Sequence, residues 1–97
     1  MYARVSTIYG TAEQGADMVT MFRDEVLPVV DELDGKGAIL MVDRGSGKAV
    51  GITLWEDEAA MRQSEERANE LRRQAAESAG ATEPPLVDRY EVLVWEV

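Results

Sequence analysis

The chain has 97 residues, of which 45% are hydrophobic and 30% are charged, and its formal net charge is −9. This length and composition suit a single soluble globular domain covering residues 1–97. The acidic balance argues against nucleic acid and anionic membrane surfaces as partners, because their phosphates would repel the protein. Cysteine and histidine are both absent, which excludes disulfides, thiol nucleophiles, histidine-dependent triads, and thiolate or imidazole ligation of zinc or haem. We therefore expect neither a metal nor a cofactor.

Membrane-spanning and targeting segments are not evident. The longest aliphatic run is "AILMV", residues 38–42, whereas a span needs about 20 apolar residues. The opening "MYARVSTIYG" lacks the basic and apolar regions of a signal peptide. These features predict a cytoplasmic protein.

The first half of the chain predicts a strand followed by a helix. Residues 2–9 are rich in β-branched and aromatic side chains, as strands are. Thr11, with Gln14 three residues later, is typical of a helix start, and Asp34-Gly35 is typical of a helix end. Pro28 should remove one hydrogen bond and bend this helix. The apolar positions between these limits follow one helical face: Val19, Phe22, Val26, Val29, Val30 and Leu33.

The second half predicts two strands, a helix and a last strand. The two strands cover residues 37–43 and 48–55, and Asp57 is a favourable N-cap for the helix that follows. Gly80 ends this helix, and the linker "ATEPP" leads to a final strand over residues 86–97. The helix carries a narrow stripe of apolar and small residues: Met61, Ser64, Ala68, Leu71 and Ala75.

This β-α-β-β-α-β order is the ferredoxin-like pattern of an α+β fold. It predicts a four-stranded antiparallel sheet with both helices on one face. Neither face of the predicted strands is uniformly polar, since residues 48–55 place Val50, Ile52 and Leu54 on one side and Trp55 on the other. Helices cover one face only, so a second copy of the sheet is the simplest cover for the other face. The alternative is a monomer with a moderately apolar exposed sheet.

The glycine-rich stretch "VDRGSGKAVG", residues 42–51, superficially suggests a phosphate-binding loop. Such a loop needs a glycine where Val42 stands and a hydroxyl where Ala49 stands, and it should lead into a helix rather than a strand. We therefore interpret residues 44–47 as a hairpin link, in which Gly45 and Gly47 supply positive φ angles.

The resemblance to a known family rests on "FRDEVLPVVDELDGKGAILMVDRGSGKAVGITLWEDEAAMRQS" and the closing "DRYEV". These segments resemble the dimeric α/β-barrel superfamily, and within it small proteins grouped with antibiotic-biosynthesis monooxygenases. The most specific pieces are D-R-x-x-G-K at residues 43–48, the strand end at Trp55 and "AM-x-x-S" at residues 60–64. The resemblance implies a homodimer with facing sheets and an apolar pocket between each sheet and its helices. Some relatives oxidise polyketide-like aromatics without a cofactor, while haem-degrading relatives need a histidine that this chain lacks.

Four residues are predicted to line that pocket and bind a ligand: Trp55, Ser64, Tyr9 and Met61. They would supply shape and orientation, and we assign no catalytic residue. Each also has a structural interpretation. Trp55 and Met61 are equally typical of a core, Ser64 of close packing with its hydroxyl bonded one turn back, and Tyr9 of strand packing. Met18, Met41, Tyr2 and Tyr90 carry the same two interpretations, while Asn69 should be exposed.

Arg4 is the sharpest polar feature, because an arginine on a central strand must find a partner. We expect a carboxylate such as Glu91 at the dimer interface, with an anionic substrate as the alternative. Taken together, the sequence predicts a homodimer that binds a small, flat, hydrophobic or aromatic molecule. A cofactor-independent monooxygenase is one form of this function, and a non-catalytic ligand-binding or interaction protein is the other.

Overall fold

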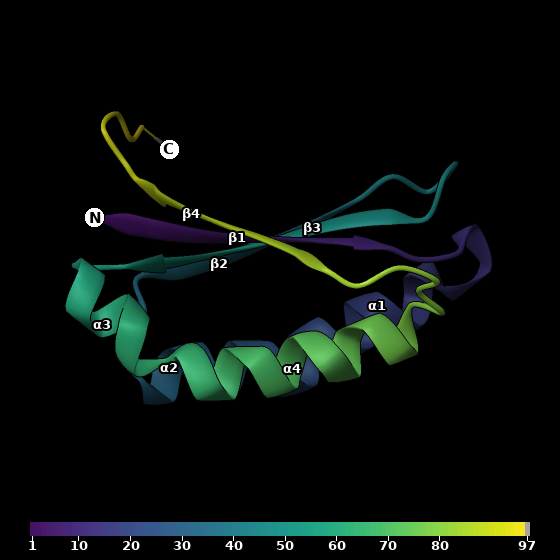
Figure 1. Ribbon diagram of the computed structural model, residues 1–97, viewed down its shortest axis with the longest axis horizontal. Helices are drawn as coiled ribbons and strands as arrows, with labels where there is room; N and C mark the ends of the chain where they lie inside the picture. The colour runs from purple at the N-terminus through teal and green to yellow at the C-terminus, as the bar shows by residue number, and fades with distance from the viewer. Residues whose placement is uncertain (97) are drawn as a thin grey trace.

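A four-stranded sheet lies over a layer of helices in the computed structural model of the protein, which describes residues 1–96 (Figure 1). The strands are β1 (Tyr2–Tyr9), β2 (Gly37–Val42), β3 (Lys48–Trp55) and β4 (Leu86–Glu91). They pair in the order β2-β3-β1-β4, and every pair is antiparallel. The predicted α+β, ferredoxin-like fold is thus confirmed, with β1 central as expected.

The first helical region is broken where the sequence predicts one continuous helix. It consists of η1 (Ala12–Gln14), α1 (Gly15–Met21), the π-helical η2 (Phe22–Val26) and α2 (Leu27–Glu32). The break follows from Pro28, which has no N–H to donate to a carbonyl of the preceding turn. Just before it, the Leu27 N–H reaches back five residues to the Phe22 carbonyl, which is π-helical bonding.

The second helical region is also divided, into α3 (Glu58–Gln63) and α4 (Glu65–Ser78). Asp57 caps α3 as predicted, because its carboxylate accepts a hydrogen bond from the Ala60 N–H at 2.8 Å. The division falls at Ser64, whose hydroxyl donates to the Met61 carbonyl at 2.7 Å. Serine hydroxyls compete with helical backbone bonding in this way, so the stripe residue predicted to lie mid-helix instead forms a joint.

The last strand is shorter than predicted, ending at Glu91, and Val97 lies outside the described residues. β4 is an edge strand beside β1, and Glu91 pairs with Tyr2, the first residue of β1. The Val92 N–H still donates to the Met1 carbonyl at 2.8 Å, just beyond the end of the ladder. Residues 92–96 turn away from the helical layer in Figure 1.

The link between β2 and β3 is the predicted hairpin. The Asp43 carboxylate accepts hydrogen bonds from the Gly45 and Ser46 N–H groups at 2.9 and 3.4 Å. Gly47 adopts a positive φ of 82°, but Gly45 does not, which corrects the prediction that both glycines do so. A Cβ at position 47 would stand 2.4 Å from the carbonyl carbon of Thr11, so this glycine also permits close approach of the preceding loop.

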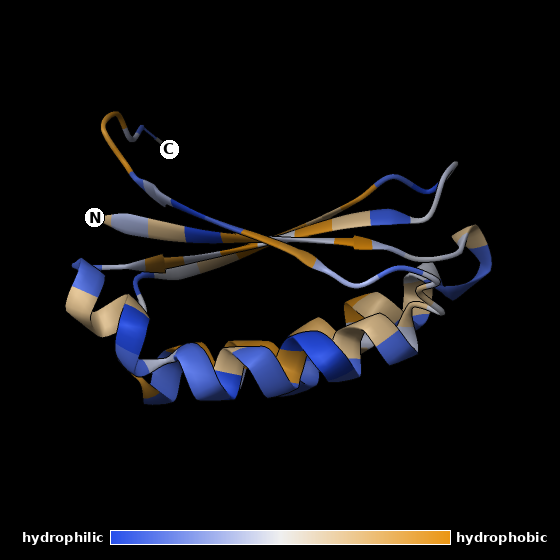
Figure 2. Cartoon of the chain, in the orientation of Figure 1, coloured by the Kyte–Doolittle hydropathy of each residue, from blue (hydrophilic) through white to orange (hydrophobic). Residues whose placement is uncertain are grey.

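The two faces of the sheet differ in what covers them. The helices cover the face that carries Arg4 and Trp55, whereas no helix covers the opposite face in Figure 1. The uncovered face takes the alternate residues of each strand. Four of its large hydrophobic side chains are exposed to solvent: Ile39 by 43%, Met41 by 49%, Leu86 by 54% and Tyr90 by 55%. Figure 2 shows apolar colouring in the tail after β4, separated by a hydrophilic stretch from the apolar start of that strand.

No helix among residues 1–96 combines the length and the apolar character needed to cross a membrane.

Candidate functional site

A cavity of about 70 Å³ lies between the sheet and the helices. Its walls come from β1, β2 and β3 on one side and from α1, η2, α2 and α4 on the other, and they are mostly aliphatic or aromatic. The apolar lining residues are Ile8, Met18, Phe22, Val26, Val29, Val30, Leu40, Gly51, Trp55, Ala68, Leu71 and Ala75. The polar lining residues are Arg4, Ser6, Thr53, Ser64 and Arg72.

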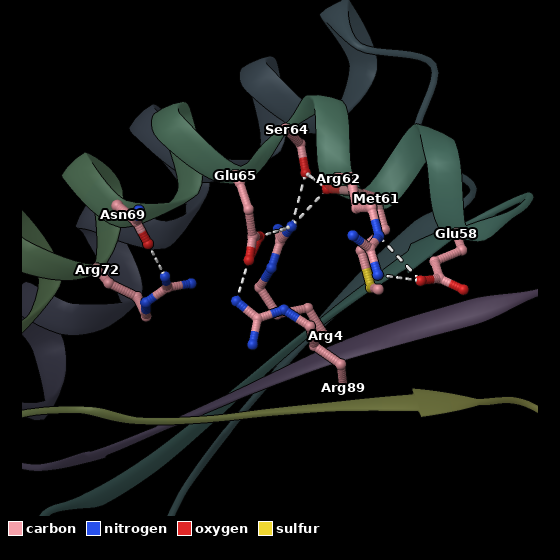
Figure 3. A network of polar contacts seen from close by, with 9 residues as sticks. All are labelled: Arg4, Glu58, Met61, Arg62, Ser64, Glu65, Asn69, Arg72 and Arg89. Carbon is pink, nitrogen blue, oxygen red and sulfur yellow. Dashed lines mark hydrogen bonds and ion pairs between the residues drawn. The ribbon is translucent and has the colours of Figure 1, made fainter.

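Arg4 provides the densest set of polar contacts in this cavity. It projects from the middle of β1 toward the helices and is only 3% exposed. One terminal nitrogen, Nη2, donates to the Met61 carbonyl at 2.6 Å, to Ser64 Oγ at 2.9 Å and to the Glu65 carboxylate (Figure 3). Its guanidinium also lies 5.9 Å from the ring centroid of Trp55. Arg4 thereby ties the central strand to the joint between α3 and α4.

The prediction that Glu91 is the partner of Arg4 is wrong. In the register of β1 and β4, Glu91 stands opposite Tyr2, and Arg89 stands opposite Arg4. Glu91 lies on the same face as Arg4, but the position beside Arg4 on β4 is taken by Arg89, and the carboxylate that Arg4 contacts is Glu65 at the start of α4. The sequence contained one signal for this pairing, since Glu65 directly follows Ser64 of the predicted stripe.

Glu65 lies between two arginines, with Arg4 on one carboxylate oxygen and Arg89 on the other. Partial burial acts to raise the pKa of this carboxyl, but the hydrogen bonds and charges of Arg89 and Arg4 outweigh it, so the net pKa lies below the ordinary value of 4.5. For Arg4, burial lowers the guanidinium pKa, Glu65 opposes that effect, and Arg89 adds to it.

Arg72 is the second cation of the cavity wall, and sequence analysis missed it. It follows Leu71 of the predicted stripe and is half-buried on α4, where its Nη2 donates to the Asn69 side-chain oxygen. Asn69 itself is exposed, as predicted. Burial lowers the pKa of Arg72, and the charge of Arg4 lowers it further.

Two of the four predicted ligand-binding residues line the cavity. Trp55 is 1% exposed and donates from Nε1 to Thr53 Oγ1 at 3.0 Å, while Ser64 is 2% exposed. Ser64 fits its structural interpretation, since its hydroxyl bonds one turn back to the Met61 carbonyl, and the residue also lines the cavity. The ligand-binding role of these residues stays a prediction.

Tyr9 and Met61 lie elsewhere. Tyr9 pairs with Lys48 and falls on the uncovered face, because side chains alternate along β1, and the Lys48 ammonium lies 5.7 Å from the centre of its ring. Met61 is 2% exposed but does not line the cavity, since α3 packs it on β1 and β3 and only its carbonyl meets Arg4. Of the other candidates, Met18 lines the cavity, whereas Met41, Tyr2 and Tyr90 do not.

The chemistry of the cavity is that of binding rather than proton transfer. Among the described residues, its lining holds hydroxyls, an indole and two guanidiniums, but no carboxylate, lysine or tyrosine. Guanidiniums donate hydrogen bonds and do not deprotonate in proteins. The volume of about 70 Å³ is also far below the roughly 300–1,000 Å³ of pockets for drug-sized ligands. In this state the cavity admits only a small ligand.

A second hollow lies on the other side of Arg72, between α4 and the linker that follows it. It measures about 350 Å³, and its lining includes Arg73, Glu77, Glu83 and Pro84. Arg72 lines both hollows and so forms part of the wall that separates the cavity from the surface.

Sequence comparison finds relatives in Mycobacterium tuberculosis. The uncharacterized protein Rv2557 is 36% identical over 93 residues, which cover 95% of this chain and 41% of the relative. The uncharacterized protein Rv2558 is 39% identical over 77 residues, covering 78% of this chain and 33% of the relative. The chain thus spans about two fifths of the length of the first of these curated relatives. No protein-family model matches the chain.

Structure comparison identifies proteins of the same fold. A Streptomyces coelicolor monooxygenase from the gene ActVA-Orf6, solved with nanaomycin D, superposes with a TM-score of 0.79 at 19% identity, covering 99% of this chain and 90% of that one. Rv0793 from M. tuberculosis gives a TM-score of 0.70 at 17% identity, covering 99% of this chain and 98% of that one. A protein of Bordetella bronchiseptica, described as a candidate antibiotic biosynthesis monooxygenase, gives a TM-score of 0.70 at 17% identity, covering 96% of this chain and 97% of that one.

Proposed function

We propose that this chain, which has the fold of the antibiotic-biosynthesis monooxygenase-type, dimeric α/β-barrel proteins, binds a small, flat, hydrophobic molecule between its sheet and its helices. One observation carries the proposal: an apolar cavity on which Arg4, Thr53, Trp55 and Ser64 converge. Ligand sites combine apolar walls with a few polar groups that fix orientation in this way. Trp55 offers a flat wall, and Ser64 offers a hydroxyl.

Fluorescence of Trp55 tests this proposal. The chain has two tryptophans, so in a Trp95→Phe background Trp55 is the single reporter, and its burial protects it from collisional quenching. We expect nitrobenzene, a flat neutral quencher, to quench Trp55 with a saturable curve.

Gly51→Val provides the cavity-filling variant. A Cβ at Gly51 meets Phe22 Cε2 at 3.5 Å, an ordinary contact, so the backbone tolerates a side chain there while the valine methyls occupy the cavity. The matched control is Thr7→Val on the uncovered face. The proposal is supported if quenching is saturable, if Gly51→Val weakens the affinity for nitrobenzene about tenfold or more, and if Thr7→Val leaves that affinity unchanged. Linear quenching that is equal in all variants refutes it and favours a non-catalytic interaction protein with a filled core.

The uncovered face of the sheet supports a homodimer in which two sheets face each other. Ile39, Met41 and Tyr90 expose apolar surface there, and Leu93 and Val94 of the tail are 82% and 90% exposed. Contiguous exposed apolar surface of this kind is typical of an interface. The two sheets would pack about 10 Å apart, with each tail reaching the partner subunit.

A charge on that face tests the dimer. In sedimentation equilibrium we expect a dimer at micromolar concentration, a monomer for Ile39→Lys, and an unchanged dimer for Leu27→Lys. Leu27 is the matched control because it is similarly exposed, by 37% against 43% for Ile39, but lies on α2 on the helical side. A wild-type monomer at that concentration contradicts the facing-sheet arrangement.

Cofactor-independent oxygenation of an aromatic polyketide-like substrate is the second candidate function. It is favoured by the fold shared with the S. coelicolor monooxygenase. In such a step an anthrone carbanion reacts with O₂, one oxygen atom becomes the new quinone carbonyl, and the other leaves as water. The substrate would supply its own acidity, consistent with a cavity that holds no base. The closed cavity of about 70 Å³ is smaller than the roughly 150 Å³ that holds benzene, so α4 and η2 must separate to admit an aromatic ligand, and must separate further for an anthrone.

Oxygen consumption distinguishes this second function from simple binding. With anthrone and no added flavin or metal, the enzymatic candidate predicts a rate above that of buffer, and Gly51→Val should reduce it. A rate equal to that of buffer excludes oxygenation of this substrate class and leaves the binding function.

A further inference from the structure

The geometry assigns a charge to the ligand of this cavity: we infer that it is a small organic oxyanion, a carboxylate or phenolate on a flat apolar body, held by Arg4 and Arg72. The inference rests on the proposed binding function and specifies which ligand that site takes. It follows from the charge balance around the cavity and from the hydrogen-bond donors left unpaired there.

The charge balance is positive although the chain as a whole carries a net charge of −9. Among the described residues, the cavity lining includes Arg4 and Arg72 but no carboxylate, and Glu65, the carboxylate that pairs with Arg4, also pairs with Arg89 (Figure 3). The hydrogen bond of Arg72 goes to the neutral amide of Asn69 rather than to Glu65. Among the described residues, the cavity wall therefore holds more positive than negative charge.

Within residues 1–96, unpaired hydrogen-bond donors occur on both arginines of the cavity lining. In the described part of the chain, two buried side-chain atoms lack a hydrogen-bond partner: Arg4 Nε and Arg72 Nη1. Both arginines line the same cavity. A buried donor without a partner is destabilising, especially on a charged group, and an oxygen anion bound beside these arginines would accept charge-assisted hydrogen bonds.

The protein itself does not fill these positions. Arg4 directs Nη2 to three protein oxygens on Met61, Ser64 and Glu65, and its Nε has no partner among the described residues. Arg72 uses Nη2 on Asn69 and keeps Nη1 free. The remaining lining is apolar, with the Trp55 ring beside Arg4. An oxyanion carried by a flat apolar body matches both parts of this surface.

The test compares benzoate with benzamide, which has nearly the same shape but no charge. In isothermal titration calorimetry of the full chain at neutral pH, we expect benzoate to bind about tenfold more tightly or better. Arg72→Gln should abolish this preference, because the half-buried Arg72 contributes charge without anchoring the joint of α3 and α4. Arg73→Gln is the matched control: this neighbouring exposed arginine pairs with Glu70 and Glu77, so the preference should remain. Circular dichroism verifies that both variants are folded.

Each outcome decides the matter. Equal binding of benzoate and benzamide, or a preference that survives Arg72→Gln, overturns the oxyanion while leaving the proposed binding of flat molecules intact. Absence of binding by benzoate, benzamide and nitrobenzene overturns both proposals. A titration with 4-nitrophenol separates the two ligand sources: tighter binding of its ionised form than of benzoate favours a phenolate, and the reverse favours a carboxylate.

Discussion

Replacement of Glu65 by glutamine tests the polar centre of the fold most sharply. Glu65 supplies the anion for Arg4, which is 3% exposed and sits on the central strand. Removing one partner of a buried ion pair costs about 3–5 kcal/mol. Glu65 is itself 28% exposed, and glutamine keeps one oxygen that can accept from Arg4, so we expect a smaller loss of about 2 kcal/mol. That is a large fraction of the roughly 5–15 kcal/mol by which small domains are stable.

Urea unfolding followed by circular dichroism measures this loss, and Glu58→Gln is the matched control. Glu58 pairs with Arg62 on the surface of α3, where the two side chains are 46% and 75% exposed, so its replacement should cost less than about 0.5 kcal/mol. Equal losses for the two variants, or a loss near zero for Glu65→Gln, would show that the burial of Arg4 does not depend on Glu65.

The same variant has a predicted pH dependence. The pKa of Glu65 in the folded protein lies below its ordinary value of 4.5, so the unfolded state binds a proton first as the pH falls. The stabilisation by Glu65 is therefore complete above about pH 4.5 and is lost as the pH falls through the lower folded pKa. The difference in unfolding free energy between wild type and Glu65→Gln should shrink across that window, and a difference independent of pH would refute the role of the charge.

Two further predictions concern backbone positions. Asp57→Ala removes the cap on the Ala60 N–H and should lower the free energy of unfolding by about 1 kcal/mol. Urea unfolding measures this loss, and an unchanged free energy of unfolding would contradict the role of the cap. Gly47→Ala should be more damaging, by about 1–3 kcal/mol, because φ is 82° and the new Cβ would approach the Thr11 carbonyl carbon to 2.4 Å. Gly45→Ala is its control, since a Cβ there meets only the Asp43 carboxylate at 3.4 Å, and equal melting temperatures for the two variants would contradict this account of the turn.

The strands could be predicted closely because their signals are local. β1 and β3 begin and end at the predicted residues, since β-branched and aromatic side chains fill them and turn residues bound them. The cap at Asp57 is equally local. The length of β4 is not a local property, because its pairing ends where the neighbouring β1 begins. Nothing in the sequence of residues 92–96 indicates that limit.

The candidate site could be predicted only in part, for the same reason. Ser64 lies on the helical side as its place in the helical stripe indicates, but the positions of Trp55 and Tyr9 depend on which face of the sheet the helices cover. The partner of Arg4 depends on the joint at Ser64, which places Glu65 within its reach. Arg72 stands beside the apolar stripe rather than in it, so helical spacing alone did not identify it.

The central claim is that a small flat molecule binds between the sheet and the helices. Isotope-filtered nuclear Overhauser spectroscopy tests it most directly, by detecting contacts between the ring protons of nitrobenzene and the methyl groups of the ¹³C-labelled protein. We predict contacts to Val29 and Leu71, which line the cavity, and none to Ile39 or Met41 on the uncovered face. Contacts confined to the uncovered face, or no contacts at all, would contradict the claim.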